Sequence, residues 1–201
     1  MKKKITLSAD TRRNKFSSGF KFLGILLFVL LVSGKSLGQV NITDNTTKTE
    51  SLTSYLGTST NPTNWDLLGS GTSYGFRGTA QTTGTSGGWY GNGNISFLGS
   101  GNASNGNATW KLYNTSGVNI NSFSLSFTGR LWKTGTASPV VRVYYMTSSS
   151  STFPVAGTTG WTEITSCSFS DATSSISTGA TISSGTVTAT VSNNNYLFLR
   201  W

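Results

Sequence analysis

The sequence predicts an all-β protein, an antiparallel two-sheet sandwich that is jelly-roll-like, preceded by a helical signal peptide. In residues 39–201, Ser, Thr, Asn and Gly make up 92 of 163 residues and supply turns. The same region holds six Trp, seven Tyr and seven Phe at near-neutral charge, unlike a disordered chain. These aromatic and β-branched residues fall in short runs without helical periodicity, which is typical of strands.

Residues 1–38 are predicted to be the signal peptide. An apolar run, Phe22–Val32, follows a basic stretch, and as a helix it would span about 16 Å, too short for a bilayer core of about 30 Å. Small residues before the predicted cut place cleavage between Gly38 and Gln39. We therefore expect a secreted, extracellular or cell-surface protein that meets the membrane only through an uncleaved leader.

The leader also carries most of the positive charge. It holds eight of the 15 Lys and Arg, so residues 39–201 keep seven bases and five acids, a net charge of +2. A nucleic-acid footprint needs a clustered basic face on the folded domain. We therefore expect no nucleic-acid partner.

Residues 39–63 form a polar lead-in that includes a possible first strand, and residues 64–201 form the sandwich module. Weak strand patterns occur at 51–56, 73–79 and 94–98. The clearest strand is 107–113, in which Ala108, Trp110 and Leu112 share one face and Thr109, Lys111 and Tyr113 the other.

Two hairpins are predicted in the second half. A turn at 114–117 would join 107–113 to the alternating run 122–127, and a turn at 192–195 would join 186–191 to 196–201. Between them, the apolar run 139–146 is predicted to be a central strand, and 161–169 alternates less cleanly. The chain stops inside the last predicted strand, at Trp201, so we expect that a longer protein continues there.

Several segments resemble an N-terminal β-sandwich module of large secreted or cell-surface bacterial proteins, the Bacteroidetes-type exported multidomain proteins. The order and spacing of these segments carry the resemblance: Gly87–Gly91, Phe97–Gly101, Asn114–Gly117, Ser124–Lys133, Trp161–Glu163 and Leu199–Trp201. Arg130 departs from the family, which commonly has Glu there. The resemblance implies a module without enzymatic activity, placed before hydrolase or nuclease domains, adhesive repeats or a sorting domain.

The chemistry of the side chains also argues against an enzyme. The sequence has no His, which excludes a Ser-His-Asp relay, a Cys-His pair and imidazole metal ligation. A glycosidase would need two carboxylates close together, and Glu163 and Asp171 are better explained as surface acids.

No cofactor or metal is expected. Asp44 and Glu50 are the densest oxygen ligands in 41–50 and too few for a calcium site. Cys167 is alone, so it is expected to be a small buried side chain.

The aromatic residues are the candidate ligand-binding groups. Trp89 and Tyr90 lie between glycines, which we expect to leave at least one ring accessible for stacking on a sugar. The other interpretation is that Trp110 and Trp132 fill the core while Trp89 packs under a loop.

The sequence therefore predicts a secreted non-catalytic β-sandwich module with a structural or adhesive role in a larger protein. One alternative is a carbohydrate-binding module that uses exposed Trp or Tyr. The other is an accessory domain of a hydrolase or nuclease whose catalytic part lies beyond residue 201. Its partners would be a surface polysaccharide or other domains of the same protein.

Overall fold

A computed structural model gives the fold. It describes residues 40–44, 46–52, 55, 57, 60–70, 88–91, 93–99, 104–130, 140–155, 157–170 and 179–201. Within these ranges the regular structure is β-strand, apart from one 3-10 turn, η1 (Thr165–Cys167). The predicted all-β class is therefore confirmed.

A boundary between Leu37 and Gly38 divides the chain into two compact units, and every described residue belongs to the second. The predicted signal peptide and its cleavage site at Gly38 and Gln39 lie outside the described residues. None of the helices in the described ranges has the length and apolar character needed to cross a membrane.

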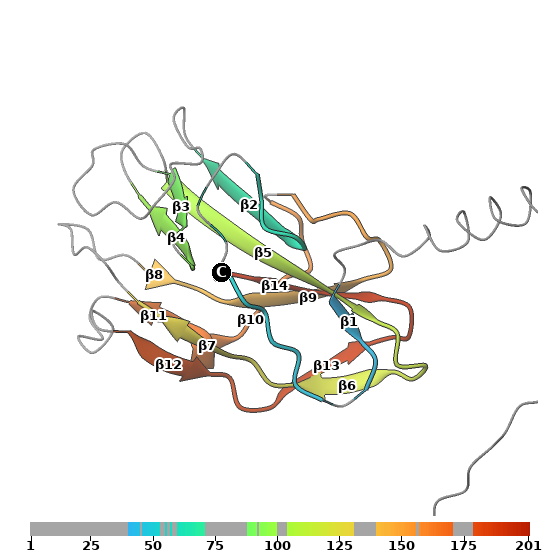
Figure 1. The fold of residues 1–201 in the computed structure, drawn as a ribbon. Helices are drawn as coiled ribbons and strands as arrows, with labels where there is room; N and C mark the ends of the chain where they lie inside the picture. The colour runs from blue at the N-terminus through green and yellow to red at the C-terminus, as the bar shows by residue number, and fades with distance from the viewer. Residues whose placement is uncertain are drawn as a thin grey trace, which may run out of the picture. The chain divides into compact units, whose positions relative to one another are not determined.

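A six-stranded sheet forms one layer of the second unit (Figure 1). Its strands are β1 (Val40–Ile42), β2 (Trp65–Ser70), β5 (Ser104–Asn114), β14 (Tyr196–Arg200), β9 (Tyr144–Ser148) and β10 (Thr162–Glu163). The order is β1-β5-β14-β9-β10, and β2 also pairs with β5. The pairing of β1 with β5 is parallel and the others in this sheet are antiparallel, so the sheet is not purely antiparallel. The polar lead-in thus contributes β1.

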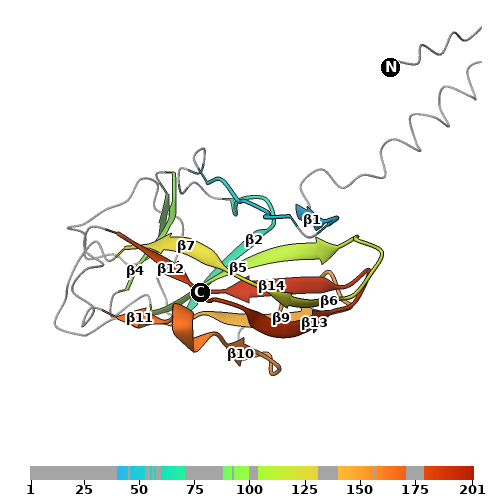
Figure 2. The same cartoon turned by 90° about the horizontal axis from the view of Figure 1, so that it is seen from below.

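An interrupted two-stranded ribbon faces this sheet. Its strands are β6 (Ile120–Phe123), β7 (Ser126–Gly129), β12 (Ala180–Ser183) and β13 (Val187–Val191), with β6 on β13 and β7 on β12. Ser184 bridges the break, because its N–H donates to the Leu125 carbonyl at 2.9 Å and its hydroxyl accepts from the Leu125 N–H at 2.8 Å. Figure 2 shows the same strands from below.

Two short strand pairs complete the fold. They are β3 (Gly88–Gly91) with β4 (Ile95–Leu98), and β8 (Val140–Val141) with β11 (Phe169–Ser170). The first of these confirms the strand expected at 94–98.

The core lies between the large sheet and the ribbon. Trp65 and Trp110 stack with their ring centroids 5.9 Å apart, and Trp201 lies 5.5 Å from Trp65. From the ribbon, Phe127 meets Trp201 edge-on at 5.4 Å, and Val191 is fully buried in the same cluster. The apolar side chains on the inner face of each layer therefore pack against those of the other layer, as in a two-layer sandwich.

Both predicted hairpins are wrong. The strand β5 has β14 on one edge and β1 and β2 on the other, so no edge remains for β6. Both edges of β14 are likewise paired, one with β5 and the other with β9, which leaves no edge for β13. The two predicted turns are instead corners at which the chain passes from one layer to the other.

The run at 139–146 is a central strand only in its second half. It divides into β8 and β9, with Arg142 and Val143 between them, and β9 lies between β14 and β10. In the described part of 51–56, Ser51, Leu52 and Tyr55 are not in a strand. The pattern at 73–79 lies outside the described residues.

Candidate functional site

The two aromatic residues singled out from the sequence are buried. Trp89 is 3% exposed and Tyr90 is 2% exposed. The indole N–H of Trp89 donates to the Leu68 carbonyl at 3.2 Å, and its ring lies 4.9 Å from that of Phe97. The hypothesis that flanking glycines leave one of these rings accessible is therefore wrong, and the other interpretation, that Trp89 is packed, is confirmed. Trp110 belongs to the core as predicted, and Trp132 lies outside the described residues.

Glu163 is engaged in polar contacts at the edge of the large sheet. Its carboxylate accepts from the Ser168 hydroxyl at 2.8 Å and pairs with Arg142 at 3.5 Å. Asp171 lies outside the described residues, so its position relative to Glu163 is not part of the described fold.

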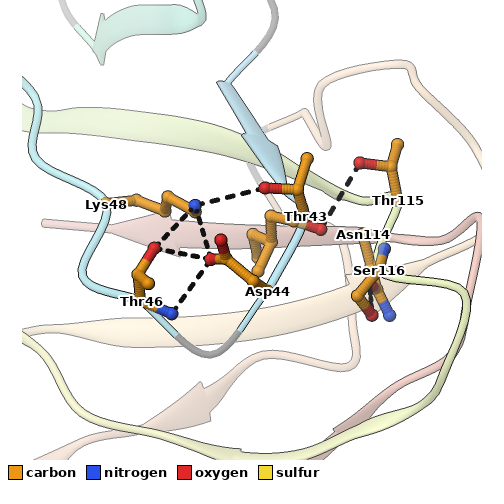
Figure 3. A network of polar contacts seen from close by, with 8 residues as sticks. Thr43, Asp44, Thr46, Lys48, Asn114, Thr115 and Ser116 are labelled. Carbon is orange, nitrogen blue, oxygen red and sulfur yellow. Dashed lines mark hydrogen bonds and ion pairs between the residues drawn. The ribbon is translucent and has the colours of Figure 1, made fainter. Parts of the chain in front are cut away.

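The Asp44 carboxylate accepts hydrogen bonds from neighbours within its own segment (Figure 3). Lys48 Nζ donates to it at 2.9 Å, and the Thr46 N–H donates at 3.0 Å. The hydroxyl of Thr46, followed by Lys48, lowers the pKa of Asp44 to about 2. Burial raises the pKa of Glu50. Among the described residues, no group of three or more His, Cys, Asp or Glu could hold a metal ion.

A pair of tyrosines stands on the face of the large sheet opposite the core. Tyr113 on β5 and Tyr196 on β14 are direct register partners, and their ring centroids lie 4.6 Å apart at 32°. Both are half-buried, and the Tyr113 hydroxyl donates to Asn194 Oδ1 at 3.4 Å. Neighbours in register share a sheet face, so Asn41 on β1 and Ser148 on β9 extend this row. We call Tyr113, Tyr196, Asn194 and Lys111 the tyrosine face.

Lys111 and an aromatic floor lie beside the tyrosine pair. Phe198 is fully buried, with its ring 6.2 Å from Tyr196 and 5.9 Å from Phe153. Lys111 Nζ lies 4.5 Å from the Phe153 centroid and 6.0 Å from the Tyr196 centroid, and donates to the Ser151 carbonyl at 3.1 Å. The segment 149–155, which we call the strap, therefore borders the tyrosine face.

Arg200 binds a second residue of the strap, Pro154, near the end of that segment. Its Nη2 donates to the Pro154 carbonyl at 2.6 Å, and its Nε donates to Thr109 Oγ1 at 3.0 Å. The guanidinium carbon lies 3.9 Å from the centroid of the Trp161 ring, a cation–π contact. Burial lowers the pKa of Arg200, and the charge of Asp66 opposes this shift. Arg200 is thus a structural cation that holds the strap on the sheet.

The sequence alone predicts only one side of the tyrosine face, the residues on β5. The alternation in 107–113 places Lys111 and Tyr113 on the face opposite Trp110. The second ring, Tyr196, joins them only through the pairing of β14 with β5, which no local pattern encodes.

The tyrosine face combines aromatic rings suited to stacking with polar groups suited to hydrogen bonding. It offers two half-buried tyrosine rings, a phenolic hydroxyl, a carboxamide and an ammonium group, and of these only the ammonium carries charge. No protein-family model matches the chain, and neither a curated protein nor a solved structure shows significant similarity to it.

Proposed function

We propose that the chain is an exported, non-catalytic β-sandwich module with a structural or adhesive role in a larger extracellular or cell-surface protein, and that it adheres to glycans. The basic and apolar leader supports export. The observation that carries the adhesive role is the half-buried pair of Tyr113 and Tyr196 on the outer face of the sheet. This pair takes the place of the buried Trp89 and Tyr90 as the proposed site.

A sugar chain fits the chemistry of this face. Each sugar ring has an apolar face that a tyrosine ring can cover, and hydroxyls that a phenol or carboxamide can bond. The row Asn41, Tyr113, Tyr196 and Ser148 crosses four strands, or roughly 14 Å at about 4.8 Å per strand spacing. An extended polysaccharide segment would lie along this row.

Retention on immobilised polysaccharides tests the proposal. The chain is expressed with its own leader and recovered after export, and N-terminal sequencing should begin at Gln39. We expect retention on at least one polysaccharide, and about tenfold weaker retention for Tyr196→Ala, since covering one ring is worth about 1.4 kcal/mol.

Two further variants keep this test interpretable. Tyr144→Ala removes a half-buried tyrosine from the same sheet face, in register with Arg200 and away from the pair, and should bind normally. Tyr196→Phe keeps the ring and should retain most of the binding. If the folded chain is retained on no polysaccharide, the proposed adhesive role is wrong.

A further inference from the structure

We infer that the tyrosine face is specific for an acidic glycan, in which the carboxylate of a uronic acid pairs with Lys111. This inference rests on the proposed function and adds the class of ligand. It follows from the distribution of charge over the outer face of the large sheet and from the position of Lys111 over the Tyr196 ring.

Among the described residues, the carboxylates on this side of the sheet, Asp66 and Glu163, each interact with a basic residue. Asp66, Arg200 and Glu163 belong to one cross-strand row, through the partners Thr109 and Tyr144. Arg200 interacts electrostatically with Asp66, whose carboxylate also accepts from Asn61 Nδ2 at 3.1 Å. Arg142 pairs with Glu163 at 3.5 Å.

Lys111 has no such partner among the described residues. It forms no ion pair there, and the acceptor it contacts is a neutral carbonyl, that of Ser151. An ammonium group has three N–H donors, so donors remain for a ligand. The charge of Lys111 is therefore the uncompensated charge of the tyrosine face.

The position of Lys111 indicates where the carboxylate of a bound glycan would lie. Its Nζ lies over the Phe153 ring, 4.5 Å from the centroid, and over the Tyr196 ring at 6.0 Å. A sugar stacked on the tyrosine pair would bring its ring substituents toward this ammonium. A carboxylate bonded directly to the sugar ring extends little beyond it, which suits a cation this close to the stacking surface.

The test compares the exported chain on polygalacturonate and alginate, on the neutral glucans laminarin and amylose, and on the sulfated polymer dextran sulfate. We expect retention on the uronic-acid polymers to exceed that on the neutral ones about tenfold at low salt, and to fall as ionic strength rises to about 0.15 M. Lys111→Gln should remove this preference, a loss of about three- to tenfold, while Lys111→Arg should keep it.

A matched control removes a different positive charge. Arg142→Gln takes away an exposed cation whose partner is Glu163, and it should leave the preference unchanged. A melting temperature like that of the parent chain shows that each variant is folded.

The outcomes separate this inference from the proposed function. Equal retention on neutral and uronic-acid polymers, or loss of the preference in Arg142→Gln but not in Lys111→Gln, would overturn the acidic-glycan inference and leave glycan adhesion standing. A stronger response to dextran sulfate than to either uronic-acid polymer would overturn the assignment to a carboxylate. Retention on no polymer at all would overturn the proposed function itself.

Discussion

The side-chain amide of Asn114 donates to the main-chain carbonyl of Val191 at 2.9 Å, across the two corners of the sandwich. The same Nδ2 donates to the Val118 carbonyl at 2.9 Å. The main chain adds two bonds between the corners, from the Asn114 N–H to the Asn195 carbonyl and from the Asn194 N–H to the Asn114 carbonyl. One fully buried side chain thus ties together the two places where the chain changes layers.

Replacing Asn114 with Ala should destabilise the fold strongly. The variant would leave the Val191 carbonyl without this donor in a buried site, and the Ser116 N–H would lose its acceptor, Asn114 Oδ1. A buried group left unsatisfied costs about 1–3 kcal/mol. We expect the free energy of unfolding to fall by about 2–4 kcal/mol, measured by urea denaturation. Asn121→Ala, at an exposed strand position, should cost less than about 0.5 kcal/mol. Similar losses for both variants would mean that the amide of Asn114 does not join the layers.

The strands could be predicted from the sequence where burial alternates, and their pairing could not. The alternation around Trp110 predicted β5 correctly, because a strand with one face in the core needs a period of two. Which strand takes each edge of β5 depends on segments far apart in the chain, such as β1, β2 and β14. A turn such as 114–117 looks the same locally whether it closes a hairpin or a corner.

The candidate site was difficult to predict for the same reason. The glycines around Trp89 suggested access to the ring, whereas contacts with Phe97 and the Leu68 carbonyl, which are tertiary, bury it. Tyr113 lies on the polar face of a predicted strand, but its partner Tyr196 lies 83 residues later in the sequence, and only the strand register brings the rings together. Exposure and pairing of aromatic residues are thus properties of the folded sheet.

Replacing Arg200 with Met should release the strap. Met keeps much of the apolar stem but loses the bonds to Pro154 and Thr109 and the contact with Trp161, and hydrogen bonds from a charged group contribute about 1.5–3 kcal/mol. We expect stability to fall by about 2–3 kcal/mol and amide exchange in 149–155 to accelerate more than in β5.

Arg142→Met is the matched control, because its ion pair with Glu163 is long and exposed and should contribute less than about 1 kcal/mol. Unchanged exchange of the strap in Arg200→Met would contradict a role for Arg200 in holding it.

Gly106 should tolerate no side chain while Phe97 is present. A Cβ at this position would lie 2.5 Å from Cγ of Phe97, which belongs to β4 in the separate β3–β4 pair. Gly106→Ala should therefore cost about 1–3 kcal/mol through overpacking. In a Phe97→Ala background the same change should be nearly neutral or stabilising, because Gly weakens a strand. The double-mutant cycle in urea measures this coupling, and additive losses would exclude the clash.

The pKa values of the two carboxylates in the lead-in, Asp44 and Glu50, should be shifted in opposite directions. The hydrogen bonds from Thr46 and Lys48 lower the pKa of Asp44 from 3.8 to about 2, and burial raises the pKa of Glu50 above 4.5. Ionised Asp44 therefore stabilises the fold above about pH 3.8, and this contribution is lost as the pH falls through about 2. Carboxyl NMR titration checks the direction of both shifts. Thr46→Val should raise the pKa of Asp44, more than Lys48→Met does, and a midpoint near 3.8 in the parent chain would contradict the network.

Cys167 should react with thiol reagents only when the sandwich opens. Its side chain is 0% exposed, and burial raises its pKa, so little reactive thiolate is present near pH 8. Labelling by a disulfide reagent should therefore be slow in the native chain and immediate in urea. If opening is fast compared with labelling, the rate follows the population of the open form. Asn114→Ala should then accelerate labelling roughly thirtyfold or more, in line with a stability loss of at least about 2 kcal/mol. An unchanged rate would mean that the segment around Cys167 opens without separation of the two layers.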